Sequence, residues 1–165
     1  MAKTLIYIQE HGYASKDELD GALKAASEKA ASSKKTLKET ENRLKEVNQQ
    51  IHYTGQYLSN KSVYSQFLRS KNKELFRKEH SAEITLYETA LKILKEQSNN
   101  GKLPSLKLLK EEKELLIKEK NKQREAYHHD SKHQKELHTV CSNINTILNK
   151  PFTHSNDQYK NLDIS

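Results

Sequence analysis

The sequence predicts an all-α fold, an elongated antiparallel helical bundle or coiled coil of two long helices with a shorter third helix. Uncharged residues recur in unbroken alternating steps of four and three, although 31% of the chain is charged, and this period of 3.5 is typical of helices that pack lengthwise. Only four Gly and two Pro interrupt the 165 residues. The apolar fraction of 33% is below the roughly 45–50% of a globular domain, so each helix can bury only a stripe. The seam of the first long helix consists of Leu19, Leu23, Ala26, Ala30, Ser33, Leu37, Thr40, Leu44, Val47, Ile51, Thr54 and Leu58.

The first two elements have recognisable ends. Residues 4–11 predict a short helix that Gly12 ends as a C-terminal cap. Ser15 followed by Glu18 fits a capping box, in which a hydroxyl and a carboxylate satisfy free backbone amides at a helix start. The first long helix is therefore predicted from about Lys16 to Leu58, with a break at residues 60–62.

A corner and two further helices are expected next. One or two separate helical turns are predicted over residues 63–68, and a second boundary is predicted at residues 70–72. The shorter helix is predicted from Lys73 to Gln97, and the second long helix from Leu106 to Asn149 with Ser105 as its cap. The seam of the second long helix, with a polar middle, is Leu109, Lys113, Leu116, Lys120, Gln123, Tyr127, Asp130, Gln134, Leu137, Cys141, Ile144 and Leu148.

The predicted domains are a short N-terminal helix (1–14), a long-helix coiled-coil bundle (15–149) and a disordered tail (150–165). An antiparallel pairing would bring the apolar stretch 137–148 against the start of the first long helix, together with Leu5, Ile6 and Ile8. A parallel dimer built on the first long helix is the alternative, so the chain is expected to be a monomer or a homodimer.

The sequence contains no convincing catalytic or metal-binding pattern. His129 and His133 share a helix face beside His128, but a structural zinc site needs four ligands and a catalytic site three. Cys141 lies on a seam, where packing is more common than reactivity. Tyrosines also fall on or beside apolar stripes, namely Tyr53, Tyr57, Tyr64 and Tyr87. We therefore expect no enzymatic activity, no cofactor and no metal.

Charge and cysteine usage bear on partners and compartment. The net charge is +7, from 29 Lys and Arg against 22 Asp and Glu, which favours an acidic partner, although interspersed signs are also typical of an exposed helix surface. A single cysteine fits a reducing cytoplasm, and no apolar run approaches the roughly 20 residues of a membrane span. The first residues are too weakly apolar for a signal peptide. We expect a cytoplasmic protein with no membrane contact.

The best candidate for binding is the basic corner between residues 60 and 80. Six cations stand there against Glu74 and Glu79, with Tyr64, Phe67 and Phe76 between them. Cations interleaved with aromatics can hold a phosphate backbone and stack bases. The alternative is that the aromatics are buried and the cations only keep the corner solvated. The candidate nucleic-acid-binding residues are Lys61, Arg69, Lys71, Lys73, Arg77 and Lys78.

Several stretches resemble a known family in the same order along the chain. They are Lys61–Leu68 (KSVYSQFL), Phe76–His80 (FRKEH), Ala82–Ala90 (AEITLYETA), Gly101–Leu106 (GKLPSL) and Leu137–Leu148 (LHTVCSNINTIL). Together they resemble the C-terminal helical region of relaxases, the mobilisation nucleases of Firmicutes integrative and conjugative elements.

The resemblance implies a role in conjugative DNA transfer. The catalytic tyrosine and the metal-binding histidine cluster of that family belong to an N-terminal nuclease domain that this chain lacks, so no catalytic residue carries over. Three functions follow as expectations: a DNA-binding accessory module of a relaxase, a helical module that binds other conjugation proteins without DNA, or a structural spacer.

Overall fold

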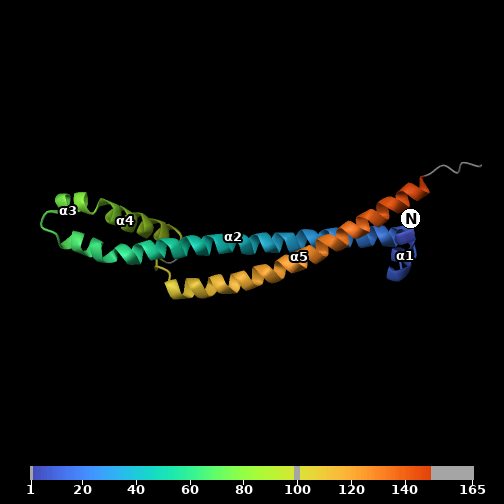
Figure 1. Cartoon of the computed structure of the whole chain (residues 1–165), viewed down its shortest axis with the longest axis horizontal. Coiled ribbons are helices and arrows are strands. Elements are labelled where there is room, and N and C mark those ends of the chain that lie inside the picture. The colour runs from blue at the N-terminus through green and yellow to red at the C-terminus, as the bar shows by residue number, and fades with distance from the viewer. Residues whose placement is uncertain (1, 99–100, 150–165) are drawn as a thin grey trace, which may run out of the picture. The chain divides into compact units, whose positions relative to one another are not determined.

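The computed structural model describes residues 2–98 and 101–149, and all regular structure among them is helical. The helices are α1 (Ala2–His11), α2 (Lys16–Arg69), α3 (Lys73–Glu79), α4 (Ser81–Glu96) and α5 (Leu106–Leu148) (Figure 1). The predicted all-α class is confirmed. Within these ranges, no helix is both long enough and apolar enough to cross a lipid bilayer. The predicted tail, 150–165, lies outside the described residues.

The chain divides into two compact units, and α2 and α5 each contribute to both. Unit 1 contains residues up to Ala31 and from His128 onward, and unit 2 contains Ser32–Tyr127. Each unit therefore combines segments of α2 and α5 with one or two of the shorter helices.

In unit 1, α1, the start of α2 and the end of α5 share one core. Leu19 and Ala26 of α2 pack with Leu137, Val140 and Cys141 of α5. The partners run in opposite directions. The Cys141 thiol lies 3.9 Å from the Leu19 carbonyl, whereas Gln134 donates to the Ser27 hydroxyl at 3.2 Å, and Lys29 pairs with Asp130 at 3.4 Å.

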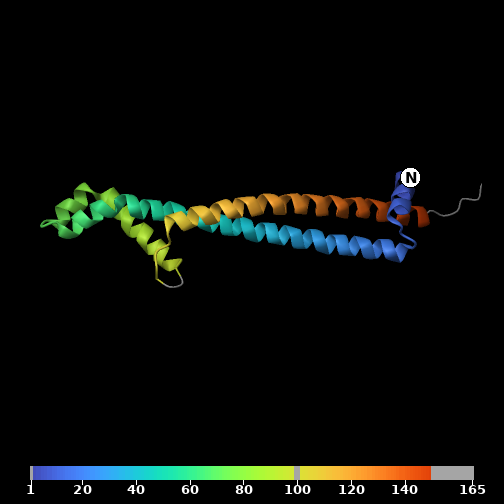
Figure 2. The same cartoon turned by 90° about the horizontal axis from the view of Figure 1, so that it is seen from below.

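The contact of α1 with this core follows a different face from the one we expected. Leu5 and Ile6 are 55% and 51% exposed, while Tyr7 and Ile8 pack against the core. Thr4 is buried and accepts a hydrogen bond from Asn143 at 2.9 Å, near the end of α5 where Figure 2 shows α1 crossing it. The contacting positions 4, 7 and 8 follow the helical spacing of three and four, so the prediction for Leu5 and Ile6 was wrong.

The capping signals at the start of the chain are present in the structure. Gly12 ends α1 with φ +69°, a conformation that costs glycine little. The Ser15 hydroxyl accepts from the Glu18 amide at 3.2 Å, and the Glu18 carboxylate accepts from the Ala14 amide at 2.8 Å. The reciprocal bond thus reaches one residue before the cap, but it satisfies the same kind of free donor.

In unit 2, α3 and α4 fold back along the last part of α2 (Figure 1). The buried side of α4 is formed by Ile84, Tyr87, Ala90 and Leu94. On the first part of α5, Leu109 is buried. Arg43 of α2 donates to Glu112 of α5 at 2.8 Å, so α2 also contacts α5 in this unit.

The predicted seams describe the buried sides of both long helices almost to their ends. Eleven of the twelve predicted positions on α2, and eleven of twelve on α5, are buried or half-buried. The exceptions are Leu58 and Leu148, which are 49% and 64% exposed. On α2 the inward position passes from Thr54 to Tyr57, which stacks on Tyr87. Two consecutive steps of three replace the alternation there, and such a local change of period shifts the buried stripe around the helix.

The predicted break at residues 60–62 was wrong, because α2 continues to Arg69. The side-chain amide of Asn60 donates to the Gln56 carbonyl one turn earlier, at 2.8 Å. The residue that we expected to break the helix therefore forms a hydrogen bond within it. Phe67 is buried and holds this extension in place. The boundary predicted at residues 70–72 does separate α2 from α3.

The helix predicted from Lys73 to Gln97 is divided at His80 into α3 and α4. His80 has φ −118° and ψ 34°, outside helical geometry, although its amide still donates to the Phe76 carbonyl at 2.9 Å. Its ring lies 4.4 Å from that of Phe76. The second long helix was predicted within one residue, since α5 ends at Leu148.

Candidate nucleic-acid interface

The six predicted cations lie around the turn between α2 and α3, which we call the cationic tip. It comprises Lys61, Arg69, Lys71, Lys73, Arg77 and Lys78. Residues 60–80 contain these six cations and only two carboxylates. The local excess of four positive charges is more than half of the net charge of +7. All six cations are on exposed residues.

Backbone geometry at the turn sets where three of these cations lie. α2 ends at Arg69 and α3 begins at Lys73. The Ser70 hydroxyl donates to the Asn72 carbonyl at 3.1 Å, and the Asn72 side chain caps α3 by accepting from the Leu75 amide at 3.1 Å. Arg69, Lys71 and Lys73 fall within five consecutive residues, and these hydrogen bonds hold that exposed segment in a defined turn.

Aromatic side chains support the tip from inside. Phe67 is buried, its ring lies 6.4 Å from Phe76 and 5.7 Å from Tyr64, and Tyr64 in turn stacks on Tyr87 at 4.1 Å. These rings are used for packing between α2, α3 and α4. The tip therefore presents its cations at the surface, and its aromatics serve the fold.

Arg77 differs from the other members of the tip. Its guanidinium binds the two carboxylate oxygens of Glu88 at 2.7 and 3.3 Å and lies 4.9 Å from the centroid of the Phe67 ring. The hydrogen bonds to Glu88 raise the pKa of Arg77. Its charge is partly compensated, and the side chain ties α3 to α4.

Lys61 and Lys78 flank the three central cations. Lys61 lies eight residues before Arg69 on α2, about 12 Å along the helix, with its ammonium 5.9 Å from the centroid of the Tyr57 ring. Lys78 is in the last turn of α3. Arg69, Lys71 and Lys73 are therefore the three cations that lie in or directly beside the turn.

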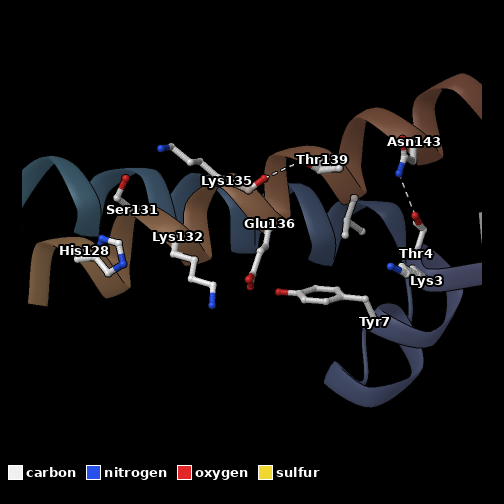
Figure 3. A pocket seen from close by; sticks show the side chains of 11 residues that line it. Lys3, Thr4, Tyr7, His128, Ser131, Lys132, Lys135, Glu136, Thr139 and Asn143 are labelled. Atoms are coloured by element: carbon white, nitrogen blue, oxygen red, sulfur yellow. Dashed lines mark hydrogen bonds between the residues drawn. The ribbon is translucent and has the colours of Figure 1, made fainter. Parts of the chain in front are cut away.

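A second candidate site is a groove in unit 1, between α1 and α5, that sequence reasoning missed. Its volume is about 650 Å³, and its lining includes Lys3 and Tyr7 of α1 with Lys132 and Glu136 of α5. Figure 3 shows three polar groups directed toward the same region of the groove: the Tyr7 hydroxyl, the Glu136 carboxylate and the Lys132 ammonium. The only sequence signal was the helical spacing that places position 7 on the same side of α1 as position 4.

Tyr7 has unusual surroundings in this groove. Its hydroxyl oxygen is buried and makes no hydrogen bond within the described ranges. Burial raises the pKa of Tyr7, and the nearby Tyr13 and Glu136 raise it further. The hydroxyl therefore remains protonated at neutral pH and retains a proton that it could donate. The ring is fixed from the other side by a stack on His11, with centroids 3.9 Å apart.

The cysteine and histidines of α5 lie close to acidic groups without forming a metal centre. Cys141 is buried, and burial followed by the nearby Asp20 raises the pKa of its thiol, which disfavours the nucleophilic thiolate. His129 lies 3.5 Å from the Asp130 carboxylate, while His128 lines the groove. Across residues 2–98 and 101–149, no three or more His, Cys, Asp or Glu side chains are grouped to hold a metal ion.

Comparison with known proteins adds no relative to these observations. No family model, no curated protein and no solved structure matches the chain.

Proposed function

We propose that this chain is a non-catalytic helical module of a conjugative relaxase, and that its cationic tip binds the phosphate backbone of DNA. The observation that carries the proposal is the exposed turn with Arg69, Lys71 and Lys73, in a segment with a local excess of four positive charges. Such a surface binds polyanions by releasing condensed counterions and does not need to read bases. The link to relaxases rests on the resemblance of the five sequence stretches.

The non-catalytic role is supported by the character of the groups that could react. Burial raises the pKa of the Cys141 thiol, which disfavours the nucleophilic thiolate. A buried cysteine kept as a thiol also fits the reducing cytoplasm in which we place the protein.

The proposal includes an antiparallel coiled coil of α2 and α5 as the support of the tip. In unit 1 the opposed pairs Lys29–Asp130 and Ser27–Gln134 support this arrangement. In unit 2 the Arg43–Glu112 pair does so. A monomer whose α2 seam is covered by α5 is favoured over a parallel dimer built on that seam.

The test is fluorescence anisotropy of labelled single- and double-stranded DNA at increasing salt. We expect the combined changes Arg69→Gln, Lys71→Gln and Lys73→Gln to weaken binding regardless of sequence. They should also lower the salt slope, by about 2 for single strands and nearly 3 for duplex if all three residues contact phosphates. Glutamine keeps the helix-forming tendency at Arg69 and Lys73, the ends of α2 and α3, and Arg77 remains to hold α3 on α4.

The matched control removes three exposed lysines from the middle of α2, Lys34→Gln, Lys38→Gln and Lys45→Gln. It changes the net charge by the same amount without touching the tip. Equal loss of binding in both variants would mean that overall charge, and not the tip, attracts DNA. An unchanged affinity in the tip variant would refute the tip as the contact surface.

A helical module that binds another protein without DNA is the second candidate. Leu108 and Leu115 lie seven residues apart on α5 and are 64% and 66% exposed, so they share one face of the helix. Exposed leucines in register are typical of a contact with another helix. Light scattering checks the case in which the partner is a second copy: a homodimer that becomes monomeric in the variant Leu108→Lys with Leu115→Lys would favour it.

A spacer is the third candidate, and it predicts a different result. Deleting one heptad from α2 and the facing heptad from α5 should preserve folding and DNA affinity but change transfer frequency in a mating assay. If transfer tolerates the deletion, a spacing role is excluded.

A further inference from the structure

The groove between α1 and α5 has the mixture of groups found in sites for small molecules. Such sites usually measure 300–1,000 Å³ and combine apolar lining with a few polar groups, and this groove has a volume of about 650 Å³. The Tyr7 ring and Val140 supply apolar surface, while Ser131 and Thr139 add hydroxyls. Charged side chains enter from both helices.

Charge in the groove favours an anionic ligand. Lys3, Lys132 and Lys135 line it against a single carboxylate, Glu136. The Lys132 ammonium ends near the Tyr7 hydroxyl, whereas Lys3 lies toward the backbone end of the Tyr7 side chain (Figure 3). A phosphate beside the hydroxyl would therefore receive a charge-assisted hydrogen bond from Lys132, and Lys3 adds positive charge from α1.

The Tyr7 hydroxyl is a second, independent indication of a ligand. A buried hydroxyl without a hydrogen-bond partner costs free energy that an acceptor would recover, and this oxygen is buried with none among the described residues. The stack of Tyr7 on His11 keeps the ring in place, so the hydroxyl is already positioned before a ligand arrives.

We propose that this groove binds a nucleotide, in which a phosphate group is joined to an aromatic base. The phosphate lies beside Lys132 and accepts from the Tyr7 hydroxyl, while Lys3 adds positive charge from α1. The base packs on the Tyr7 ring and Val140, and the Glu136 carboxylate accepts from its N–H groups. A ligand that is anionic throughout would leave the Glu136 carboxylate without a donor, whereas the base supplies one. The nucleotide is either free or the terminal nucleotide of a single strand, and this inference goes beyond the proposed function of the tip.

The test is an NMR titration of the isotopically labelled full chain with adenosine 5′-monophosphate, adenosine and inorganic phosphate. We expect the nucleotide to shift amide signals in α1 and in residues 128–143, and to bind more tightly than adenosine or phosphate alone. An absence of shifts in these segments at millimolar nucleotide would overturn the proposal. Equal affinity for phosphate and the nucleotide would also overturn it, because the ring would then contribute nothing.

Variants separate specific binding from general attraction. Lys3→Gln with Lys132→Gln should weaken nucleotide binding about tenfold, which is the effect of losing roughly 1.4 kcal/mol, and Tyr7→Phe should weaken it about threefold to fivefold. The control Lys24→Gln changes an exposed lysine of the same unit and should have no effect. Unchanged affinity in the double variant would refute the groove as the site.

The two sources of the nucleotide are distinguished in the variant that lacks the tip cations Arg69, Lys71 and Lys73. A 5′-phosphorylated oligonucleotide that still shifts the groove signals of this variant, while its unphosphorylated form does not, identifies a strand end as the ligand. Shifts produced only by the free nucleotide identify the free molecule. DNA binding lost at the tip with groove binding retained would show that the two proposals stand or fall separately.

Discussion

The rings of Tyr64 and Tyr87 stack with their centroids 4.1 Å apart and their planes 17° from parallel. Tyr64 belongs to the last part of α2 and Tyr87 to α4. Tyr57 joins the same cluster from about two turns earlier on α2, with its ring 5.0 Å from that of Tyr87. This cluster gives the extension of α2 beyond residue 60 an apolar partner. It also fixes α4 against α2 close to the cationic tip.

Removing Tyr87 should destabilise unit 2 strongly. Its side chain is 8% exposed, and truncation of a large buried aromatic costs about 3–5 kcal/mol, so Tyr87→Ala should lower the unfolding free energy by roughly that amount in urea titrations followed by circular dichroism. The control Tyr64→Phe keeps a stacked ring and should change stability by less than about 1 kcal/mol. A small effect of Tyr87→Ala would mean that the cluster is not packed in solution.

The seam on α2 can be tested at two positions that the sequence pattern predicts to be buried alike but that differ in exposure in the structure. Val47 is completely buried, whereas Leu58 is 49% exposed. Val47→Asp places an unpaired carboxylate among apolar groups and should cost several kcal/mol, seen as a large drop in melting temperature. Leu58→Asp should cost less than about 1 kcal/mol. Equal effects at both positions would contradict the shift of the buried stripe to Tyr57.

The ion pair between Arg43 and Glu112 is expected to contribute modestly. Nε and Nη2 of Arg43 both lie 2.8 Å from Oε1 of Glu112, but the side chains are 44% and 37% exposed, and exposed pairs are screened by solvent. A double-mutant cycle with Arg43→Gln and Glu112→Gln should give a coupling free energy of about 0.2–1 kcal/mol. The coupling should shrink in high salt.

Alkaline pH should destabilise the protein through three buried acidic groups. Burial raises the pKa of Cys141, Tyr7 and Tyr87 in the folded state. Each group therefore holds its proton more tightly when folded than when unfolded. The stability that this difference provides is complete below the unfolded pKa values and is lost as pH rises through the folded ones.

The measurement is the unfolding free energy between pH 7 and 11. The fall should begin near the ordinary cysteine pKa of about 8.5 and steepen toward that of tyrosine, about 10. Cys141→Ala should remove the part of this pH dependence that begins near the cysteine pKa. Tyr7→Phe with Tyr87→Phe should remove the part that begins near the tyrosine pKa. An unchanged pH profile in the triple variant would contradict this assignment.

Most of the fold could be predicted because helices and their buried sides follow from local sequence. Alternating steps of three and four place side chains on one face of a helix whatever lies opposite, which is why eleven of twelve seam positions on each long helix were found. The cap at Ser15 and the turn at Gly12 are also local, since their hydrogen bonds and positive φ involve neighbouring residues.

The wrong predictions concern residues whose role depends on distant partners. Asn60 and its neighbours resemble a break, yet α2 continues because Phe67 and the tyrosine cluster pack beyond it. The same cluster selects Tyr57 over Leu58. His80 interrupts a predicted single helix at the position where its ring contacts Phe76 and α4 turns back toward α2.

The sequence by itself determined that the chain is helical, which sides of α2 and α5 are buried, and where the cations of the tip gather, because these depend on contacts within a few residues. Only the tertiary structure decided that the aromatics near the tip are packed inside, that Arg77 binds Glu88, and that Tyr7 faces Lys132 and Glu136 across a groove. Those relationships join residues that lie from 9 (Phe67 and Phe76) to 129 (Tyr7 and Glu136) positions apart in the sequence. Their physical cause is the packing of one helix on another, which periodicity within a single helix does not specify.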